Sequence, residues 1–321
     1  MKSLLDNIVG QRILVVGDLM LDRYTWGDAS RISPEAPVPV VDVSRESCVA
    51  GGAANVALNL RTLGAEAEVC GWVGQDAAGT ELVELLSKTN IDIDPVFHAH
   101  GKITIVKSRI MVRNQQLCRL DREDVPAGYA LNSEDIARVV ELAGRADAVI
   151  FSDYGKGTLS EELVNALGCS QNGHLLLAMD PKPRRRIAHH GLSLLTPNRS
   201  EALQLAGLEI MRGDPFPETE VCRRIYETYQ PENLVITMGG DGMLVSRAGE
   251  VSLRIPTMAR EVFDVSGAGD TVVAALTLAL SSGAEIEKAA RFANLAAGIV
   301  VGKVGTATVS PSELLSLGES L

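Results

Sequence analysis

Two aspartates and two glycines lie within seven residues near the carboxyl end of the chain, in the segment Asp264-Val-Ser-Gly-Ala-Gly-Asp270. The small-residue stretch after it predicts a helix, so the N–H groups of Gly267, Ala268 and Gly269 would point outward at a helix N-terminus. Such amides, with the helix dipole, stabilise an anion such as a transferring phosphoryl group. Asp270 would lie beside that anion and could accept the proton of an attacking hydroxyl. An N-capping aspartate after a glycine turn is the competing interpretation.

Paired glycines also open a second expected helix, in the segment Gly51-Gly-Ala-Ala-Asn55. Gly51 and Gly52 would let another molecule approach closely. Asn55 at the helix start could form a hydrogen bond with a hydroxyl group of a ligand. A helix start with a small-residue packing face explains the same residues equally well.

Further polar side chains follow expected strands. Asn198 and Glu201, three residues apart, match a capping box, in which each side chain bonds the other's backbone N–H. Alternatively, both face a metal–nucleotide complex at the carboxyl ends of the strands, where open α/β sheets bind ligands. Asp18 follows the expected strand 12–17, with Asp22 four residues later, and a carboxylate there can accept hydrogen bonds from two ligand hydroxyls.

Cations follow two other expected strands, in residues 152–157 (SDYGKG) and 180–186 (DPKPRRR). Lys156 and Lys182 are candidates to hold phosphates at the same sheet edge. Residues 184–186 are equally well explained as a solvated charge run. The glycine turn at 237–242 (TMGGDG) could border a ligand or form only a hairpin.

Short β-branched runs alternate with longer amphipathic stretches along most of the chain. The expected strands are 12–17, 68–73, 148–152, 175–180, 194–196 and 234–238, and the expected helices are 51–63, 79–88, 160–167 and two stretches after Gly269 and Ala284. This alternation favours parallel pairing with right-handed crossovers, hence a layered α/β core. Residues 34–43 and 102–112 look like strands without a neighbouring helix, which predicts a small antiparallel flap.

Composition excludes several classes of partner. The 321 residues are 46% hydrophobic and 22% charged, as in a globular protein, and the net charge is 30 − 41 = −11, which disfavours a nucleic-acid partner. No apolar run approaches the roughly 20 residues that span a bilayer, and no secretory signal is recognisable. The five cysteines are scattered and form no C-x-x-C pair. We therefore expect a cytoplasmic protein with no membrane partner.

Several common nucleotide-binding motifs are absent. The chain has no G-x-x-x-x-G-K-[ST], which excludes a P-loop enzyme. The first expected strand is followed by GDLMLD rather than G-x-G-x-x-G, which argues against a dinucleotide fold. H-R-D and D-F-G are also missing, so the chain does not resemble a protein kinase.

In their order and placement, the segments 51–55, 196–201 and 264–270 resemble the ribokinase-like (PfkB) carbohydrate kinases over essentially the whole chain. The resemblance implies an α/β fold with a three-layer α/β/α core, a mainly parallel sheet and a small β lid near 34–45 and 102–120. It also implies a homodimer formed through the lid. We expect one kinase domain over 1–321 without an adenylyltransferase domain, because the sequence contains no H-x-G-H nucleotide motif. The implied cofactors are ATP and Mg2+, with a monovalent cation such as K+ left open.

Roles carried over by motif give Asp270 as the base and Gly267, Ala268 and Gly269 as the anion hole. The other carried-over roles are nucleotide binding by Asn198, Glu201, Thr237, Gly239, Gly242 and Asp264, magnesium binding through water by Asn198 and Glu201, and sugar binding by Asp18, Gly51, Gly52 and Asn55. These roles are what the resemblance implies.

Within the family, residues 17–24 (GDLMLDRY), 31–40 (RISPEAPVPV) and 152–157 look like the heptose-7-phosphate kinases of ADP-heptose and lipopolysaccharide synthesis. The implied reaction transfers the ATP γ-phosphoryl group to O1 of D-glycero-β-D-manno-heptose 7-phosphate. The further substrate-binding candidates are Arg109, Asp153, Lys156 and Lys182, followed by the arginines at 184–186. Another PfkB sugar or nucleoside kinase, of the ribokinase or fructose-phosphate kinase type, and a non-catalytic nucleotide sensor are the alternatives.

Overall fold

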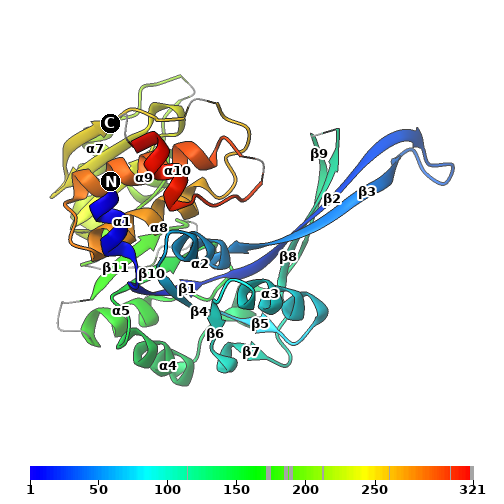
Figure 1. Cartoon of the computed structure of the whole chain (residues 1–321), viewed down its shortest axis with the longest axis horizontal. Coiled ribbons are helices and arrows are strands. Elements are labelled where there is room, and N and C mark those ends of the chain that lie inside the picture. The colour runs from blue at the N-terminus through cyan, green and yellow to red at the C-terminus, as the bar shows by residue number, and fades with distance from the viewer. Residues whose placement is uncertain are drawn as a thin grey trace.

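A nine-stranded sheet of order β15-β14-β13-β12-β11-β10-β1-β4-β6 forms the centre of the molecule (Figure 1). The computed structural model describes residues 1–113, 115–170, 175–183, 187, 191–211, 213–259, 261–303 and 305–318. The sheet consists of β1 (Arg12–Gly17), β4 (Glu66–Cys70), β6 (Asp92–Ile93), β10 (Ala148–Ser152), β11 (Leu176–Asp180), β12 (Leu194–Leu195), β13 (Asn233–Thr237), β14 (Met243–Arg247) and β15 (Glu250–Ile255). Neighbours from β6 to β13 are parallel, whereas β14 is antiparallel to both of its neighbours.

Side chains of β1 alternate between two apolar cores, because successive residues of a strand face opposite sides of the sheet. Ile13 and Val15 belong to one core, and Leu14 and Val16 belong to the other. The first core includes α1 (Lys2–Ile8), α2 (Ala53–Thr62), α3 (Ala77–Ser87), α8 (Ala268–Ser281), α9 (Ile286–Val300) and α10 (Pro311–Gly318). The second includes α4 (Ser133–Ala143), α5 (Glu161–Ser170), α6 (Arg199–Leu205) and α7 (Glu218–Tyr229). The predicted three-layer α/β/α core is confirmed.

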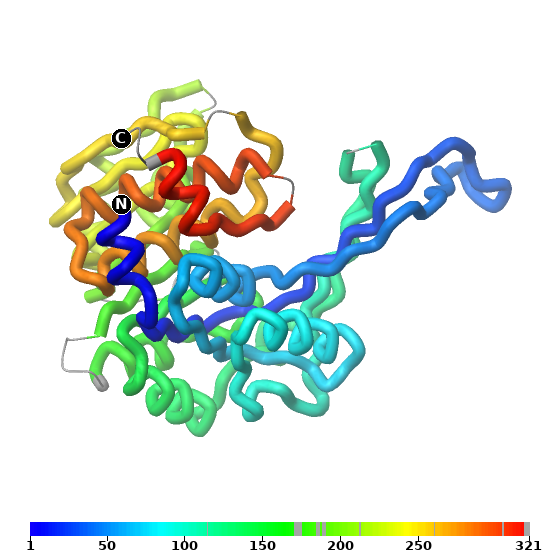
Figure 2. Tube along the Cα trace, viewed as in Figure 1, coloured from blue at the N-terminus to red at the C-terminus, as the bar shows by residue number. Residues whose placement is uncertain are grey.

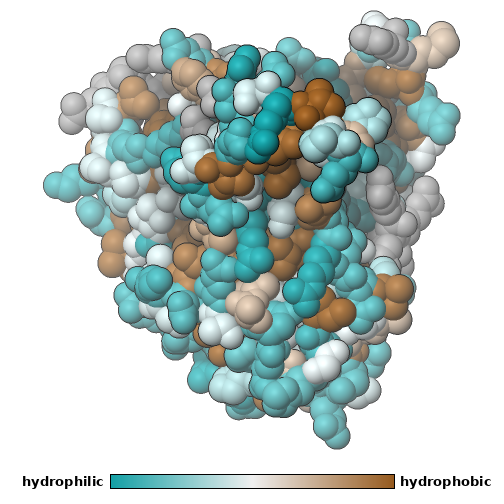
Figure 3. All heavy atoms as spheres, turned by 90° about the vertical axis from the view of Figure 1, so that its right-hand side faces the viewer, coloured by the Kyte–Doolittle hydropathy of each residue, from teal (hydrophilic) through white to brown (hydrophobic). Residues whose placement is uncertain are grey.

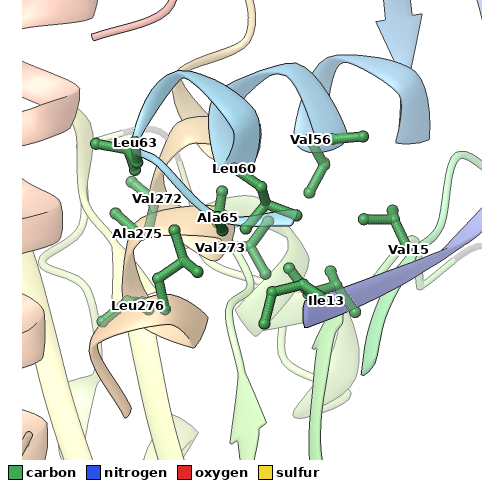
Figure 4. Packing of buried hydrophobic residues seen from close by; sticks show 14 of the residues in the cluster. Ile13, Val15, Val56, Leu60, Leu63, Ala65, Val272, Val273, Ala275 and Leu276 are labelled. Atoms are coloured by element: carbon green, nitrogen blue, oxygen red, sulfur yellow. The ribbon is translucent and has the colours of Figure 1, made fainter. Parts of the chain in front are cut away.

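Helices α2 and α8 pack side by side over β1 (Figure 4). Leu60 of α2 lies next to Val273 of α8 and above Ile13, and Val56 and Leu276 belong to the same apolar cluster. All five side chains are buried. This packing brings the N-terminal ends of the two helices together, and with them the two glycine-containing segments singled out above.

A four-stranded lid of order β3-β2-β8-β9 projects from the core (Figures 1 and 2). Its strands are β2 (Leu19–Ile32), β3 (Pro39–Gly52), β8 (Ile105–Val112) and β9 (Gln115–Arg122). The predicted lid is present, but two of its details were wrong. Residues 34–38 form a turn instead of strand, and β2 runs parallel to β8, because both enter the lid at its core end, where Met20 pairs with Ile105.

Two other expected bounds shift for steric reasons. The helix expected at 51–63 begins at Ala53, since Gly51 and Gly52 still pair with β2. The strand expected at 68–73 is β4, which ends at Cys70, because the next residue, Gly71, lies against the Gly17 carbonyl. Short elements complete the fold: β5 (Val73–Gly74), β7 (His98–Ala99) and the 3-10 turns η1 (Pro95–Phe97), η2 (Pro126–Tyr129) and η3 (Gly239–Asp241). Among the described residues, none of the helices combines the length and apolarity that crossing a bilayer requires.

Candidate active site

Asp270 lies in the first turn of α8, and its carboxylate is only 4% exposed. The hydroxyl of Tyr154 donates to its Oδ1, and the side-chain amide of Asn55 donates to its Oδ2, each at 2.6 Å. Burial raises the pKa of Asp270 to about 6, although these two hydrogen bonds and the charge of Lys182 act in the opposite direction. Asp270 is therefore ionised at neutral pH and has a pKa close enough to accept a proton.

Backbone amides surround the N-terminus of α8 beside this carboxylate. Gly267 caps the helix in the left-handed region, at φ 78°, and a Cβ there would lie 2.8 Å from the Asn55 amide nitrogen. Ala268, predicted to line an anion hole, donates its N–H to the carbonyl of Val265 at 3.2 Å. Within the described part of the chain, the N–H groups of Gly267 and Gly269 form no hydrogen bond. These two amides can therefore bind an anion.

A polar cavity of about 180 Å³ opens over Asp270 and is lined in part by Tyr154, Asp180, Lys182, Asn198 and Glu201. The ammonium group of Lys182 forms an ion pair with Glu201. Burial opposes the charge of Lys182, but Asp180 and Glu201 outweigh it, so the pKa of Lys182 is raised. Burial and the charge of Glu201 also raise the pKa of Asp180 well above its usual range. The cavity thus holds one cation beside three carboxyl groups, those of Asp180, Glu201 and Asp270.

Asn198 and Glu201 form the capping box of α6 and also line the polar cavity, so the two interpretations of this pair coexist. Asn198 Oδ1 accepts the N–H of Glu201 at 3.0 Å, and Glu201 Oε2 accepts the N–H of Asn198 at 2.8 Å. In the described ranges, no group of three His, Cys, Asp or Glu side chains is placed to hold a metal ion directly. Carboxylate oxygens suit Mg2+, which commonly keeps several waters and binds through nucleotide phosphates. The residues present fit a magnesium ion held in that way.

A second cavity, of about 270 Å³, adjoins the first and shares Thr237 and Gly269 with it. Its other lining residues include Gly239 and Gly242 in the turn between β13 and β14, and the apolar side chains of Met243, Val262, Val265, Val272 and Val301. The turn at 237–242 is thus both a hairpin and a cavity wall. An apolar cavity with a few polar groups suits a small-molecule ligand or cofactor.

Three predicted ligand carboxylates accept hydrogen bonds from backbone N–H groups instead. Asp18 accepts three, from Tyr154, Lys156 and Thr158, at 2.9–3.2 Å. Asp153 accepts those of Gly155 at 2.7 Å and Lys182 at 3.2 Å. Asp264 accepts those of Ser266 at 2.9 Å and Gly305 at 3.1 Å. In the structure these carboxylates hold loops in place, and their contact with a ligand stays a prediction.

Gly51 and Gly52 make room for aspartates rather than forming an open surface. A Cβ on Gly51 would lie 2.3 Å from Asp22 Oδ2. Gly52 has φ 59°, and a Cβ there would lie 2.4 Å from the backbone oxygen of Asp18. Asn55, two residues into α2, is buried, and its Oδ1 has no hydrogen-bond partner among the described residues. That oxygen is an available acceptor next to the base.

The predicted phosphate-binding cations fall into two groups. Lys182 lies in the polar cavity beside Asp270. Arg109 of β8 bonds Asp22 at 2.6 Å, and Lys156 pairs with Glu123 at 2.6 Å on the lid side. The arginines at 184–186 lie outside the described residues. The three candidates thus pair with three different carboxylates, and Lys182 also lies 5.8 Å from the ring centroid of Tyr154.

Lys107 is a cation that the sequence reasoning missed. It lies two residues before Arg109 on β8, so both share one face of the lid, and its ammonium is 5.7 Å from the ring centroid of Tyr154. Burial, then the charge of Lys156, lowers its pKa. Its position two residues before Arg109 in an expected strand was a usable signal, because residues two apart share a face. Tyr154 and Asp180 were also missed, and no local pattern marks their contacts with residues distant in sequence.

Comparisons with known proteins agree with this geometry. The family described as "pfkB family carbohydrate kinase" matches this chain over residues 11–313. The chain is similar to two proteins named "Bifunctional protein HldE". The identity to the protein of Sulfurimonas denitrificans is 43%, over 97% of this chain and 65% of that protein. The identity to the protein of Geobacter metallireducens is 45%, over 94% of this chain and 62% of that protein. This chain thus spans less than two thirds of the length of these relatives.

Solved structures share the fold. Ribokinase from Giardia lamblia superimposes with a TM-score of 0.77 at 19% identity, covering 97% of this chain and 99% of that one. Phosphofructokinase-2 from Escherichia coli, in complex with substrates and products, gives 0.76 at 21% identity, covering 98% and 99%. At this identity the likeness concerns the fold alone.

Proposed function

Since the chain belongs to the pfkB family of carbohydrate kinases, we propose that it phosphorylates D-glycero-β-D-manno-heptose 7-phosphate at O1, with ATP and Mg2+, to give the 1,7-bisphosphate. The observation that carries the proposal is the buried Asp270 carboxylate beside the unbonded amides of Gly267 and Gly269. The heptose is supported by the segments 17–24, 31–40 and 152–157 and by the relatives named HldE. The reaction would serve ADP-heptose synthesis in the cytoplasm.

In the proposed mechanism, Asp270 takes the proton of the sugar hydroxyl as that oxygen attacks the γ-phosphorus. The amides of Gly267 and Gly269, at the positive end of the α8 dipole, stabilise the negative charge on the transferring group. Lys182 adds a cation on the same side, in the cavity over Asp270. When bound, Mg2+ would neutralise phosphate charge, with Asn198 and Glu201 holding its water ligands. Most of the catalysis is positioning and charge stabilisation.

The distal phosphate of the sugar needs cations of its own because the chain carries a net charge of −11. Lys107 and Arg109 lie on strand β8 of the lid, and Lys156 pairs with Glu123, which directly follows β9. We assign the 7-phosphate to these three residues and leave Lys182 to the γ-phosphoryl group. Charge-assisted hydrogen bonds from such groups suit a phosphate.

The lid would also form a homodimer. Large apolar side chains are exposed on it at Ile32, Val43, Leu117 and Leu120. Viewed from the side toward which the lid projects, apolar residues gather in patches among polar ones (Figure 3). Strand β9 is an edge strand of the lid sheet, and the backbone groups along such an edge can pair with another chain.

The test is ADP release from ATP and Mg2+ with a panel of acceptors, namely the heptose 7-phosphate, ribose and fructose 6-phosphate, in KCl and in NaCl. Turnover with the heptose 7-phosphate alone is expected, and dependence on KCl would identify a monovalent-cation requirement. Preferential turnover with ribose or fructose 6-phosphate would discard the heptose and keep the kinase. Asp270→Asn protein is the control for contaminating kinases.

A further inference from the structure

Neither oxygen of the Asp270 carboxylate is free in the structure. Tyr154 donates its hydroxyl to Oδ1 and Asn55 donates its amide to Oδ2, both at 2.6 Å. Hydrogen bonds to an ionised group are shorter and stronger than those between neutral groups. Rotation of the carboxylate would break both bonds, so its orientation is set by two residues that come from different parts of the chain.

The position of Tyr154 is itself set by a buried carboxylate. Tyr154 lies in the loop after β10, and Asp18, which is 1% exposed, accepts the N–H groups of Tyr154 at 3.0 Å, Lys156 at 2.9 Å and Thr158 at 3.2 Å. One side chain thus holds the backbone at three alternate residues of the loop. The segment SDYGKG and the aspartate after β1 are therefore parts of one arrangement.

We propose that Tyr154 is a positioning residue for the Asp270 base, and that Asp18 sets the place of Tyr154 through the loop 154–158. The inference rests on the proposed function, because it takes Asp270 as the base. Burial and the charges of Asp270 and Asp180 raise the pKa of Tyr154 well above its usual range, so the phenol stays a donor. Each carboxylate oxygen has a second lone pair, which leaves room for the sugar hydroxyl.

Removing the phenol oxygen has two expected effects. The carboxylate is less well aligned for proton transfer, which lowers kcat. The ionised form also loses a stabilising bond, so the pKa of Asp270 rises further above its value of about 6. The other charged groups facing Asp270 are Lys182, Asp22 and Asp180, and all of them stay in place.

The experiment compares wild type with Tyr154→Phe in the full chain, measuring kcat and both KM values from pH 5 to 9. We expect kcat to fall about tenfold and its acid limb to move up by about one pH unit, with both KM values within about threefold of wild type. Tyr129→Phe is the matched control. It removes a hydroxyl that accepts the N–H of Asp124 and donates to the Ile103 carbonyl, and it should leave the limb unchanged.

A carbon-13 NMR titration of the Asp270 carboxyl, assigned with Asp270→Asn, needs no sugar. A titration midpoint that rises in Tyr154→Phe supports the positioning role even if heptose 7-phosphate is not the acceptor. An unchanged midpoint and kcat limb would overturn it, as would a higher kcat with a lower sugar KM, which would make Tyr154 a block to the acceptor. If Tyr154→Phe does not fold, Asp18→Asn takes its place, and the same upward shift is expected.

Discussion

The core sheet and the lid sheet use charged residues in opposite ways. In the core, Asp270 is buried, and burial raises its pKa to about 6. In the lid, Asp28 is exposed, and its hydrogen bonds to the Arg113 guanidinium lower its pKa. The same side chain is therefore prepared for proton transfer in one region and is a solvated ion-pair partner in the other. In the proposed mechanism, proton transfer uses a carboxylate whose ionisation is controlled by burial in the core, whereas phosphate recognition uses cations of the lid.

The two sheets also differ in how they are held. Five of the six residues of β1 are buried and all five of β10, whereas all eight residues of β9 are exposed. The core is stabilised by apolar burial on both faces of its sheet. The outer lid relies on backbone pairing and surface ion pairs, which contribute little. The lid can therefore change shape or partner at small cost to the fold.

The largest expected effect comes from making one change in each region. Asp270→Asn should lower kcat about a thousandfold, because a carboxamide cannot accept the proton. Asp28→Asn makes the same substitution in the lid, and its kcat should stay near the wild-type value. Steady-state ADP release at pH 8 measures both. A kcat for Asp270→Asn within tenfold of wild type would show that Asp270 is not the general base. The two aspartates would then not differ in the way proposed here.

Substitutions in the core and in the lid should also differ in their effect on the free energy of unfolding. Leu60→Ala leaves a cavity between α2 and α8 and should lower the free energy of unfolding by about 2–5 kcal/mol. Glu46→Ala, at an exposed side chain of β3, should change it by less than about 0.5 kcal/mol. Urea unfolding at one protein concentration gives both values. Equal losses would show that the lid is part of the cooperative core.

A lid substitution should weaken binding of the sugar phosphate without affecting ATP binding. Lys107→Met removes a lid cation while keeping its apolar stem, and should raise the KM for the sugar phosphate about tenfold to a hundredfold with the KM for ATP unchanged. Arg113→Met is the control, since Arg113 is an exposed lid cation paired with Asp28. It should change neither KM value. A sugar lacking the distal phosphate should not distinguish Lys107→Met from wild type. If it does, Lys107 acts on something other than that phosphate.

The smallest effect on turnover is expected at the exposed apolar residues. Leu120→Asp should dissociate a lid-mediated dimer, because it places a charge in the proposed interface, and kcat should change by less than about twofold. Sedimentation velocity across a range of concentrations measures the dimer. Glu250→Ala, an exposed change on β15, is the control. A dimer that survives Leu120→Asp unchanged would place the interface elsewhere or show that none uses this residue.

Local sequence patterns were sufficient for much of the core. The apolar runs at 12–17 and 148–152 are the strands β1 and β10 with the expected bounds. Helix α4 was missed although its capping box, Asn132 with Asp135, is a readable start signal. The long β2 was missed because Leu19–Ile32 mixes apolar and charged residues without clear alternation. Short-range signals fail where the environment of a strand changes along its length.

The candidate site could be predicted only in part. Asp270 and its glycines are adjacent in sequence, so their shared helix end could be inferred. Tyr154 reaches Asp270 across 116 residues, and Lys107 reaches the site only because β8 pairs with β2 in one particular register. The carboxylate of Asp18 could not be assigned to a loop before that loop was placed. Such contacts depend on tertiary packing, which no local pattern encodes.

A single residue, Asp18, separates the last residue of β1 from the first residue of β2. This junction sets the phase of the lid relative to the core, since side chains alternate along a strand with a period of two. One residue added here would turn Asp22 and Tyr24 to the outer face and bring their neighbours inward. The turn at 33–38 lies at the far end of β2 and does not set this phase. An insertion at the junction would instead take Asp22 away from Arg109 of β8 and leave that cation without its partner.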